Sequence, residues 1–357
     1  MPPIKPMLAK AVHAVPDTDD VLFEPKWDGF RCLVFRDGDE IELTSRNTRP
    51  LTRYIPELLD PLRSMLPDRC VVDGELVVAG GDRLDFEALQ QRIHPAKSRI
   101  DRLAAETPCS YVAFDLLAEG DDDLTERPFR ERRARLVEAL ADARPPVHLT
   151  PSTEDRSVAE DWFARFEGAG LDGVMAKPGT GPYEPNKRSQ IKIKHKRTAD
   201  VVVAGYRTHK SGDGVGSLLI GLYDEAGDLH HMGVATSFTA TRRAELVDEV
   251  ADHEDGALDD HPWREWADAE AQAAEEGGRM PGGRHRWNAQ KDMSWTPLRL
   301  RPDDGLVAEV TYDNLQSGRF RHATHMVRWR PDKDPADCRF DQLEQTPAVE
   351  LRQVFGA

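Results

Sequence analysis

The second half of the chain carries an order of apolar runs that few folds can accommodate. Three runs typical of strands come first, at 199–206, 217–223 and 230–235. A helical pattern follows at 239–251, with Thr239 or Thr241 as its N-cap, and two more strand patterns lie at 306–312 and 324–330. Three strands, a helix and two strands is the order of an OB-fold, a small Greek-key barrel that often binds nucleic acids. We therefore expect residues 198–357 to form an OB-fold domain.

An acidic stretch interrupts this order between the helix and the fourth strand. Residues 245–276 carry much of the negative excess behind the net charge of −16. The low complexity around residues 252–283 predicts an insertion that is partly disordered and contributes little to the barrel core. The average charge argues against nucleic-acid binding, but basic residues are concentrated at 187–197 and 319–330. Because the charge is segregated, the chain can still present a basic face.

The first 197 residues mix strands and helices without the regular βαβ alternation of a doubly wound sheet. Strand patterns lie at 21–23, 30–36, 40–44, 70–78, 110–117 and 171–177, and helical patterns at 54–65, 127–140 and 155–169. An Asp37-Gly38 turn joins the second and third of these strands. The pattern indicates an α+β domain over residues 1–197.

Composition and the N-terminal residues disfavour several classes of protein. The chain has no run of about 18 apolar residues, so no membrane-spanning helix is expected. The N-terminus lacks the apolar core of a secretion signal, and we expect a cytoplasmic protein. The four cysteines form no CxxC pair, so structural zinc is not expected and the thiols are interpreted as reduced.

The strongest local signal is the stretch Glu24-Pro-Lys26-Trp-Asp28-Gly29-Phe-Arg31. Its lysine lies between two predicted strands, and Gly29 permits a tight loop with close backbone approach. A lysine acts as a nucleophile when burial or nearby cations depress its pKa. The alternative is a surface lysine before a hairpin. It is disfavoured because KxDGxR would arise by chance in about 0.002 of chains of this size, on equal residue frequencies.

This stretch resembles motif I of the covalent nucleotidyltransferase superfamily, which comprises DNA ligases, RNA ligases and mRNA capping enzymes. Six further stretches are similar to the family's other motifs and follow in the same order: residues 45–47, 72–76, 114–116, 172–177, 192–194 and 330–333. The resemblance therefore spans nearly the whole chain. It implies a nucleotidyltransferase core in which antiparallel sheets with helices hold the nucleotide, followed by the OB-fold domain.

The family reaction implies a role for each lysine of the first domain. Lys26 would attack the α-phosphorus of ATP, expel pyrophosphate and retain AMP. Lys192 and Lys194 alternate with isoleucines, so on a strand both ammonium groups share one face. Beside the α-phosphate they would neutralise its charge and help to keep Lys26 partly unprotonated. By themselves these two lysines are equally consistent with an exposed strand face.

By the same resemblance, three residues at the end of the last barrel strand reach the ATP tail and orient the leaving pyrophosphate: Arg330, Asp332 and Lys333. Such a role requires the second domain to approach the nucleotide in one step and to move away afterwards. The resemblance implies a hinge near residues 196–198, where the two domains join.

Two acidic residues beside glycines are candidates for a divalent metal, Mg²⁺ or Mn²⁺. By resemblance Glu75 contacts ribose and metal, and Asp172 binds metal. The family more often has Glu at the second place, so the shorter Asp172 would act directly or through water. Taken alone, either acid is more often a turn residue. Arg31 and Arg46 suit a terminal phosphate or ribose, because a guanidinium binds phosphate in a bidentate manner.

The base would be recognised by residues from several of the motifs. Phe114 resembles the aromatic that stacks on the purine, with Met175 covering the other face, although an aromatic in an apolar strand is usually core. Glu24 could accept a hydrogen bond from an exocyclic amine, which favours adenine over guanine. Lys177 completes the predicted nucleotide-binding set.

Within the superfamily, capping enzymes are the nearest rivals. Their motif IV ends in an aromatic, whereas this chain has Ala176-Lys177, the form found in DNA ligases. Residues 192–202 and 209–212 resemble the bacterial DNA ligase C group, small ATP-dependent ligases related to the ligase domain of ligase D. The resemblance implies a monomer that seals nicked duplex DNA in repair, replication or recombination, with a repair polymerase or other repair proteins as partners. A nucleic-acid-binding protein that has lost catalysis is disfavoured, because the nucleophile, the acids and the motif V lysines are all present.

Overall fold

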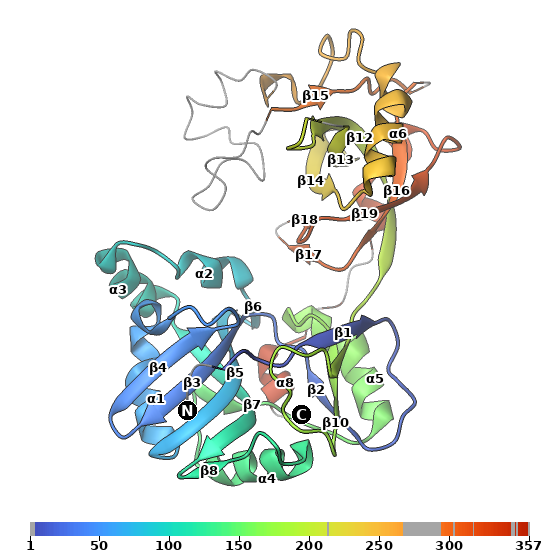
Figure 1. Ribbon diagram of the computed structural model, residues 1–357. Coiled ribbons are helices and arrows are strands. Elements are labelled where there is room, and N and C mark those ends of the chain that lie inside the picture. Colours follow the sequence, from blue (N-terminus) through green and yellow to red (C-terminus); the bar gives the residue numbers. More distant parts are fainter. Residues whose placement is uncertain are drawn as a thin grey trace. The chain divides into compact units, whose positions relative to one another are not determined.

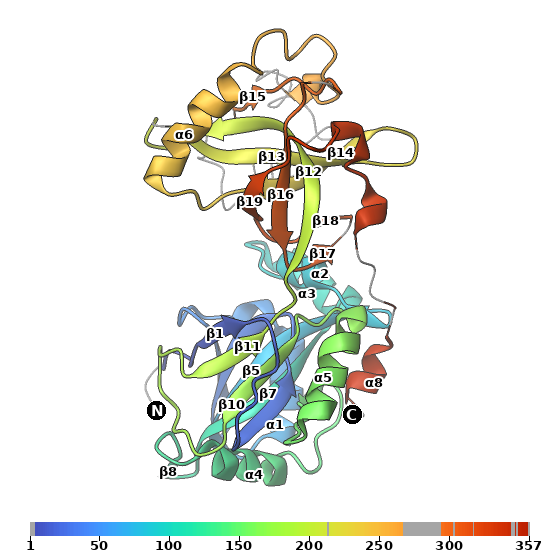
Figure 2. The ribbon, with the colours of Figure 1, turned by 90° about the vertical axis from the view of Figure 1, so that its right-hand side faces the viewer.

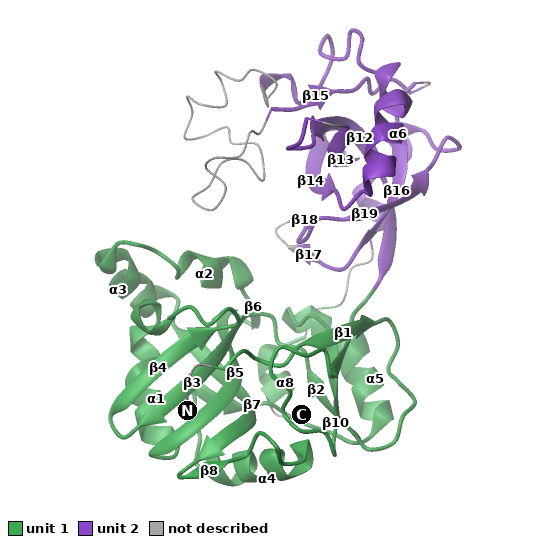
Figure 3. Ribbon diagram, in the orientation of Figure 1, with its two compact units in different colours: residues 1–195, 346–357 green, residues 196–345 purple. Residues whose placement is uncertain are grey.

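The computed structural model describes residues 4–212, 214–266, 294–302, 304–316, 318–343, 347 and 349–355. The chain divides into two compact units, residues 1–195 with 346–357 and residues 196–345 (Figure 3). The division falls two residues before the predicted boundary. The prediction that the second domain extends to residue 357 is wrong, because the last residues belong to the first unit.

The larger sheet of the first unit follows the order β4-β3-β5-β7-β8, with β6 beside β5 and β9 beside β7 (Figure 1). Its strands are β3 (Phe30–Asp37), β4 (Glu40–Ser45), β5 (Arg69–Gly80), β6 (Arg83–Leu84), β7 (Cys109–Glu119), β8 (Asp122–Asp123) and β9 (Val147–Leu149). Pairing is antiparallel except between β7 and β9. The long central strands β5 and β7 read as near-continuous apolar runs because both of their faces are largely buried.

The smaller sheet of the first unit has the order β1-β11-β10-β2. Its strands are β1 (Ala9–Val12), β2 (Val21–Pro25), β10 (Val174–Pro178) and β11 (Gln190–Ile193). In its register Met175 lies opposite Glu24 on β2 and opposite Lys192 on β11. Three residues far apart in the sequence therefore form one row across the sheet.

Helices cover the two sheets of the first unit. They are α1 (Leu59–Met65), α2 (Phe86–Gln91), α3 (Lys97–Glu106), α4 (Phe129–Ala139), α5 (Arg156–Arg165) and α8 (Leu351–Phe355), with 3₁₀ turns at Thr52–Tyr54, Pro56–Leu58 and Phe166–Ala169. The single helix predicted at 54–65 is interrupted, because Pro56 starts a new turn. Figure 2 shows α8 on the same side of the unit as α5, and both helices contribute to the core that contains β2 and β10.

The second unit has the predicted order of three strands, a helix and two principal strands. Its elements are β12 (Arg197–Thr208), β13 (Val215–Tyr223), β14 (Leu229–Ala235), α6 (Ala240–Ala251), β15 (Thr296–Pro297), β16 (Val307–Tyr312), β17 (Leu315–Gln316), β18 (Arg319–Phe320) and β19 (His325–Trp329), with 3₁₀ turns at Arg264–Trp266, Pro335–Asp337 and Phe340–Gln342. The sheet order is β14-β13-β12-β16-β19 with β15 beside β12, and Thr239 caps α6. This confirms the α+β class with a C-terminal OB-fold.

The acidic stretch differs from its prediction in the part that the structure describes. Trp263 is 3 % exposed and lies in the core of the second unit, where its indole Nε1 donates to the carbonyl of Leu229 at 2.8 Å. His261 is buried beside it, with Nε2 2.8 Å from the carbonyl oxygen of Ala204. The prediction that residues from 254 onward contribute little to the core is therefore wrong for 257–263. The aromatic rings that lie between the acidic residues are buried in the core, although the stretch as a whole is strongly charged. Residues 267–283 of the predicted insertion lie outside the described residues.

No helix in the described parts of the chain is long and apolar enough to span a membrane. All four cysteines are free and buried.

Candidate active site

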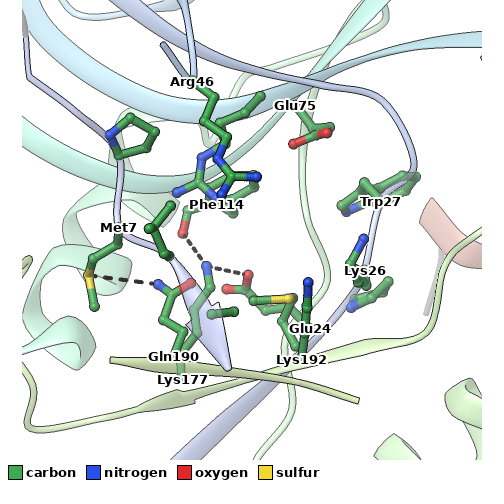
Figure 4. Close-up of a pocket in the computed structure, with 16 residues that line it drawn as sticks. Met7, Glu24, Lys26, Trp27, Arg46, Glu75, Phe114, Lys177, Gln190 and Lys192 are labelled. Carbon is green, nitrogen blue, oxygen red and sulfur yellow. Dashed lines mark hydrogen bonds and ion pairs between the residues drawn. The ribbon is translucent and has the colours of Figure 1, made fainter. Parts of the chain in front are cut away.

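A pocket of about 210 Å³ in the first unit is lined by residues from both sheets (Figure 4). Nine of the predicted site residues line it: Glu24, Lys26, Arg31, Arg46, Glu75, Phe114, Met175, Lys177 and Lys192. They come from six strands and from the loops that follow β2 and β4, spread over about 170 residues of sequence. The fold therefore gathers most of the separate sequence motifs at one place.

Lys26 directly follows β2, and both its backbone amide and its backbone carbonyl are hydrogen-bonded to residues 172–173. Its amide donates to the carbonyl of Gly173 at 2.8 Å, and its own carbonyl accepts from the amide of Asp172 at 2.9 Å. Gly173 has φ of +121°, and a Cβ there would lie 2.0 Å from the carbonyl oxygen of Ile193. Only glycine fits this close approach, which explains its place beside Asp172.

The carboxylate of Asp172 joins two lysines. Its Oδ2 lies 2.5 Å from Lys26 Nζ and 2.8 Å from Lys194 Nζ. Burial by itself would raise the pKa of Asp172, but the charges of Lys26 and Lys194 outweigh burial and lower it. Asp172 is therefore a carboxylate at neutral pH that fixes both ammonium groups. Lys194 lies just beyond β11 and reaches the site through this contact.

Lys192 adds a further cation to the pocket. Burial lowers the pKa of Lys192, and the nearby charges of Lys194, Lys26 and Arg46 lower it further, against the attraction of Asp172. A partly buried group of like charges raises the local potential and attracts an anion. The arrangement suits a phosphate beside Lys26.

The pocket also holds a buried ion pair. Lys177 Nζ lies 2.6 Å from Glu24 Oε2, and the two side chains are only 3 % and 2 % exposed. Burial lowers the pKa of Lys177 despite the attraction of Glu24. The second carboxylate oxygen, Glu24 Oε1, is buried and has no hydrogen-bond partner among the described residues. A ligand that donates an N–H group would satisfy it.

Phe114 is 7 % exposed and lies among cations. Lys177 Nζ is 4.4 Å from its ring centroid, and the Arg31 guanidinium carbon is 4.5 Å from it. The ring lines the pocket, as predicted, but it also serves as a cation–π partner. Stacking of a purine on Phe114 stays a prediction.

Arg31 belongs to a network that the sequence predictions did not include. Its Nε donates to Asp73 Oδ1 at 2.6 Å and its Nη2 to Asp73 Oδ2 at 2.5 Å, while Tyr183 Oη donates to the same Oδ2 at 2.5 Å. Burial would lower the pKa of Arg31, but the Asp73 carboxylate raises it. Asp73 lies inside the motif at 72–76 and could have been chosen from it. Nothing near Tyr183 in the sequence signals its role.

Glu75 lies opposite Arg31 in the pairing of β3 with β5. A Cβ at Gly29 would lie 2.0 Å from the backbone oxygen of Leu76, so a glycine is needed where the loop after Lys26 crosses β5. Burial raises the pKa of Glu75 to about 7, although Arg31 and Lys26 oppose the increase. A bound cation would favour the ionised form of this carboxyl group.

The two predicted metal ligands do not form a complete metal site. No group of three or more His, Cys, Asp or Glu side chains able to hold a metal ion occurs among the described residues. Magnesium is often held by one or two carboxylates together with substrate phosphates. Glu75 lines the pocket, whereas Asp172 is not among the lining residues and pairs with Lys26 and Lys194, so metal binding by these two residues stays a prediction.

Arg330, Asp332 and Lys333 belong to the second unit and do not line the pocket. Arg330 Nη1 donates to both carboxylate oxygens of Asp200, at 2.7 and 2.8 Å, and Nη2 donates to Asp332 Oδ2 at 2.8 Å. The hydrogen bond from Arg330 lowers the pKa of Asp332 to about 2. Lys333 Nζ lies 3.7 Å from Asp200. The three residues form a charged cluster around Asp200, in which Asp332 is 61 % and Lys333 37 % exposed, while Arg330 and Asp200 are 16 % exposed each.

Comparison with known proteins gives matches over nearly the whole chain. Residues 6–196 match the family described as ATP dependent DNA ligase domain, and residues 211–333 match the ATP dependent DNA ligase C terminal region. DNA ligase C of Mycobacterium tuberculosis is 54 % identical over 361 residues, covering 99 % of this chain and 97 % of that protein. DNA ligase C2 of Mycolicibacterium smegmatis is 55 % identical over 352 residues, covering 97 % of this chain and 96 % of that protein. A structure from a study of Lig E DNA ligases aligns with a TM-score of 0.54 at 17 % identity, over 91 % of this chain and 98 % of that one, a likeness of fold.

Proposed function

Because the chain belongs to the family of ATP-dependent DNA ligases, we propose that it seals nicks in duplex DNA through an AMP group carried on Lys26. One observation carries the proposal: Lys26 lines the same pocket as Lys192, and its Nζ lies 2.5 Å from the Asp172 carboxylate, which also binds Lys194 at 2.8 Å. The family uses ATP and a divalent metal, and it acts on nicked DNA.

In the first step Lys26 Nζ attacks the α-phosphorus of ATP. Nζ attacks as the neutral amine: a P–N bond forms, the bond from the α-phosphorus to the bridging oxygen breaks, its electron pair leaves with pyrophosphate, and the nitrogen releases a proton to water. Asp172 holds Nζ in place before the attack. Lys192 and Lys194 then stabilise the charge that develops on the α-phosphate oxygens.

The pocket accounts for a preference for adenine. The free oxygen of Glu24 would accept a hydrogen bond from the exocyclic amine, whereas guanine presents a carbonyl oxygen at the corresponding ring position. Lys177 holds the Glu24 carboxylate in place through their 2.6 Å ion pair. Phe114 and Met175 would contact the two faces of the purine.

In the later steps AMP passes to the 5′-phosphate of the nick, and the adjacent 3′-hydroxyl displaces it to form the phosphodiester bond. Lys192 would act in these steps too, because the α-phosphate is present in each. Arg330 and Lys333 would orient the leaving pyrophosphate and so act in the first step only.

Glu75 and Asp172 would hold the divalent ion, Mg²⁺ or Mn²⁺, together with the nucleotide phosphates. The ion would offset phosphate charge. The proposal includes a cytoplasmic, monomeric enzyme that works in DNA repair with a repair polymerase or other repair proteins.

Incubation with α-³²P-labelled ATP, followed by denaturing electrophoresis, tests the proposal directly. The wild-type chain should retain the label, whereas Lys26→Ala should not, and labelled GTP should give no adduct. Labelling of Lys26→Ala would exclude Lys26 as the nucleophile. Equal labelling by GTP would favour a capping enzyme, and no labelling of the wild type would favour a binding protein without catalysis.

A further inference from the structure

The last helix of the chain lies against the residue that follows Lys26. The Phe355 ring stacks on the Trp27 ring with centroids 4.9 Å apart and planes 24° apart. It also stacks on His148 at 4.1 Å and 23°. The chain leaves the first unit at residue 195, forms the second unit and then returns to place Phe355 here. This contact joins Phe355 to the candidate nucleophile loop.

The C-terminal segment, residues 349–355, is anchored in the core of the first unit. Val354 is fully buried and Leu351 is 7 % exposed, and both belong to the same core as Trp162 and Phe166. The amide of Leu351 donates to the carbonyl of Asp82 at 2.7 Å. Burial of two aliphatic side chains and a backbone hydrogen bond hold the segment in register.

A second close contact lies just before this segment. A Cβ added to Gly168 would lie 2.0 Å from the backbone oxygen of Pro347. The glycine therefore allows the returning chain to approach the turn after α5, and a methyl group there would push the chain away.

The Trp27 indole is anchored by a hydrogen bond at its ring edge and by aromatic stacking on its ring face. Its Nε1 donates to Thr150 Oγ1 at 2.8 Å, and the side chain is 5 % exposed. The ring face meets Phe355. Thr150 directly follows β9, which also carries His148, so the stack and the hydrogen bond anchor Trp27 to the same edge of the larger sheet. Since Trp27 is the residue after Lys26, anchoring of its ring restricts the movement of the backbone next to Lys26.

We propose that the C-terminal segment is a positioning element for the nucleophile: Phe355 fixes Trp27 and thereby holds Lys26 in line with the α-phosphate. The inference rests on the proposed function of Lys26. A displacement of about 1 Å can reduce the rate of an oriented reaction by about 10²-fold, so a support one residue from the nucleophile has a large effect. The effect is confined to adenylation, because Lys26 forms no bond when a nick that already carries AMP is sealed.

Three full-length variants test this positioning role. Phe355→Ala removes the stack, Phe355→Tyr keeps an aromatic ring, and Gln353→Ala changes an exposed residue of the same helix as a control. For each variant we would measure the single-turnover rate of self-adenylation against ATP concentration, the rate of sealing a pre-adenylated nick, and the thermal unfolding temperature.

We expect Phe355→Ala to slow self-adenylation at saturating ATP about tenfold or more. The ATP concentration at half-maximal rate and the sealing of the pre-adenylated nick should stay within about twofold, because these do not depend on in-line attack by Lys26. Phe355→Tyr and Gln353→Ala should behave as the wild type. Gly168→Ala, which acts on the returning chain from another side, should reproduce the selective loss.

Two results would overturn the inference. One is normal adenylation by Phe355→Ala. The other is an equal loss of adenylation and of pre-adenylated nick sealing with a lower unfolding temperature, which would make the segment a stabiliser of the fold only. A wild-type chain that takes no label would instead reject the proposed function itself, so the two failures can be told apart.

Discussion

The two units of the molecule carry their functional charges in different environments. In the first unit Glu24 and Lys177 pair at 2.6 Å with at most 3 % of either side chain exposed. In the second unit Asp332 and Lys333 are 61 % and 37 % exposed, and they flank an Arg330–Asp200 pair in which each side chain is 16 % exposed. Buried charges are costly to separate, whereas exposed pairs exchange partners with little change in free energy. The buried pair is thus fixed in the pocket, while Asp332 and Lys333 in the second unit are suited to contacts that are made and then released.

The largest expected effect comes from the nucleophile. Lys26→Arg should abolish the covalent AMP adduct although it keeps the positive charge, because a guanidinium is not deprotonated in proteins. The ion pair with Asp172 should survive, so the fold should be unchanged by circular dichroism. Denaturing electrophoresis after incubation with labelled ATP measures the adduct. An adduct in Lys26→Arg would show that charge, rather than nucleophilicity, is what this position supplies.

Breaking the buried pair should have the next largest effect. Glu24→Gln leaves the Lys177 ammonium buried without its counter-charge and should lower the free energy of unfolding by about 3–5 kcal/mol. Glu160→Gln is the matched control, since it breaks an exposed pair with Arg156 in the same unit, and it should cost at most about 0.5 kcal/mol. Urea titrations of both variants give the comparison. Equal losses would remove the proposed distinction between buried and exposed charges.

Changes in the charged cluster around Asp200 should affect one reaction step and leave the fold intact. Arg330→Ala and Lys333→Ala should each slow self-adenylation about 10- to 100-fold, because they remove groups that would orient pyrophosphate. Both variants should still seal a pre-adenylated nick, whereas Lys192→Ala should impair both reactions. Single-turnover assays on the three variants measure this. If the changes at 330 and 333 slow both reactions equally, the step-specific role is wrong.

The smallest effect concerns stability in mild acid. Burial lowers the pKa of His148 to about 4, below the value of about 6.5 expected in the unfolded chain. Between these pH values the unfolded chain binds more protons than the folded chain. The stabilisation that the neutral, buried His148 gives to the fold is therefore complete above pH 6.5 and is lost as the pH falls toward 4. His148→Phe should keep the ring stack. When the pH is lowered from 7 to 5, the free energy of unfolding of this variant should fall by about 1–2 kcal/mol less than that of the wild type.

Asp332, an exposed residue of the second unit, offers the control for this pH dependence. Asp332 has a pKa of about 2, so it is ionised in the folded and unfolded chain between pH 7 and pH 5. Asp332→Asn should therefore leave the change in stability over this range as it is in the wild type. Urea titrations at pH 7 and pH 5 check both variants, and an unchanged pH dependence in His148→Phe would contradict the role given to burial.

Much of the fold and the pocket could be predicted because the signals are local. The strand patterns and the N-cap of α6 depend on residues a few positions apart, and these predict elements but not their partners. Motif resemblance then assembled the pocket, and nine of its predicted residues line one cavity. Tyr183 was missed, because an aromatic residue in a loop carries no sign of the buried Asp73 that it contacts.

The sequence by itself determined the chemistry that this protein can perform: a lysine in KxDGxR, two lysines that alternate with isoleucines, and an order of strands and helix that few folds accommodate. Only the tertiary structure decided which distant groups meet. Asp172 bridges Lys26 and Lys194, Trp263 enters the barrel core from an acidic stretch, and residues 349–355 return to the first unit. The reason is physical: burial and ion pairing depend on which surfaces come together, and separation along the chain leaves no periodic pattern from which to infer those contacts.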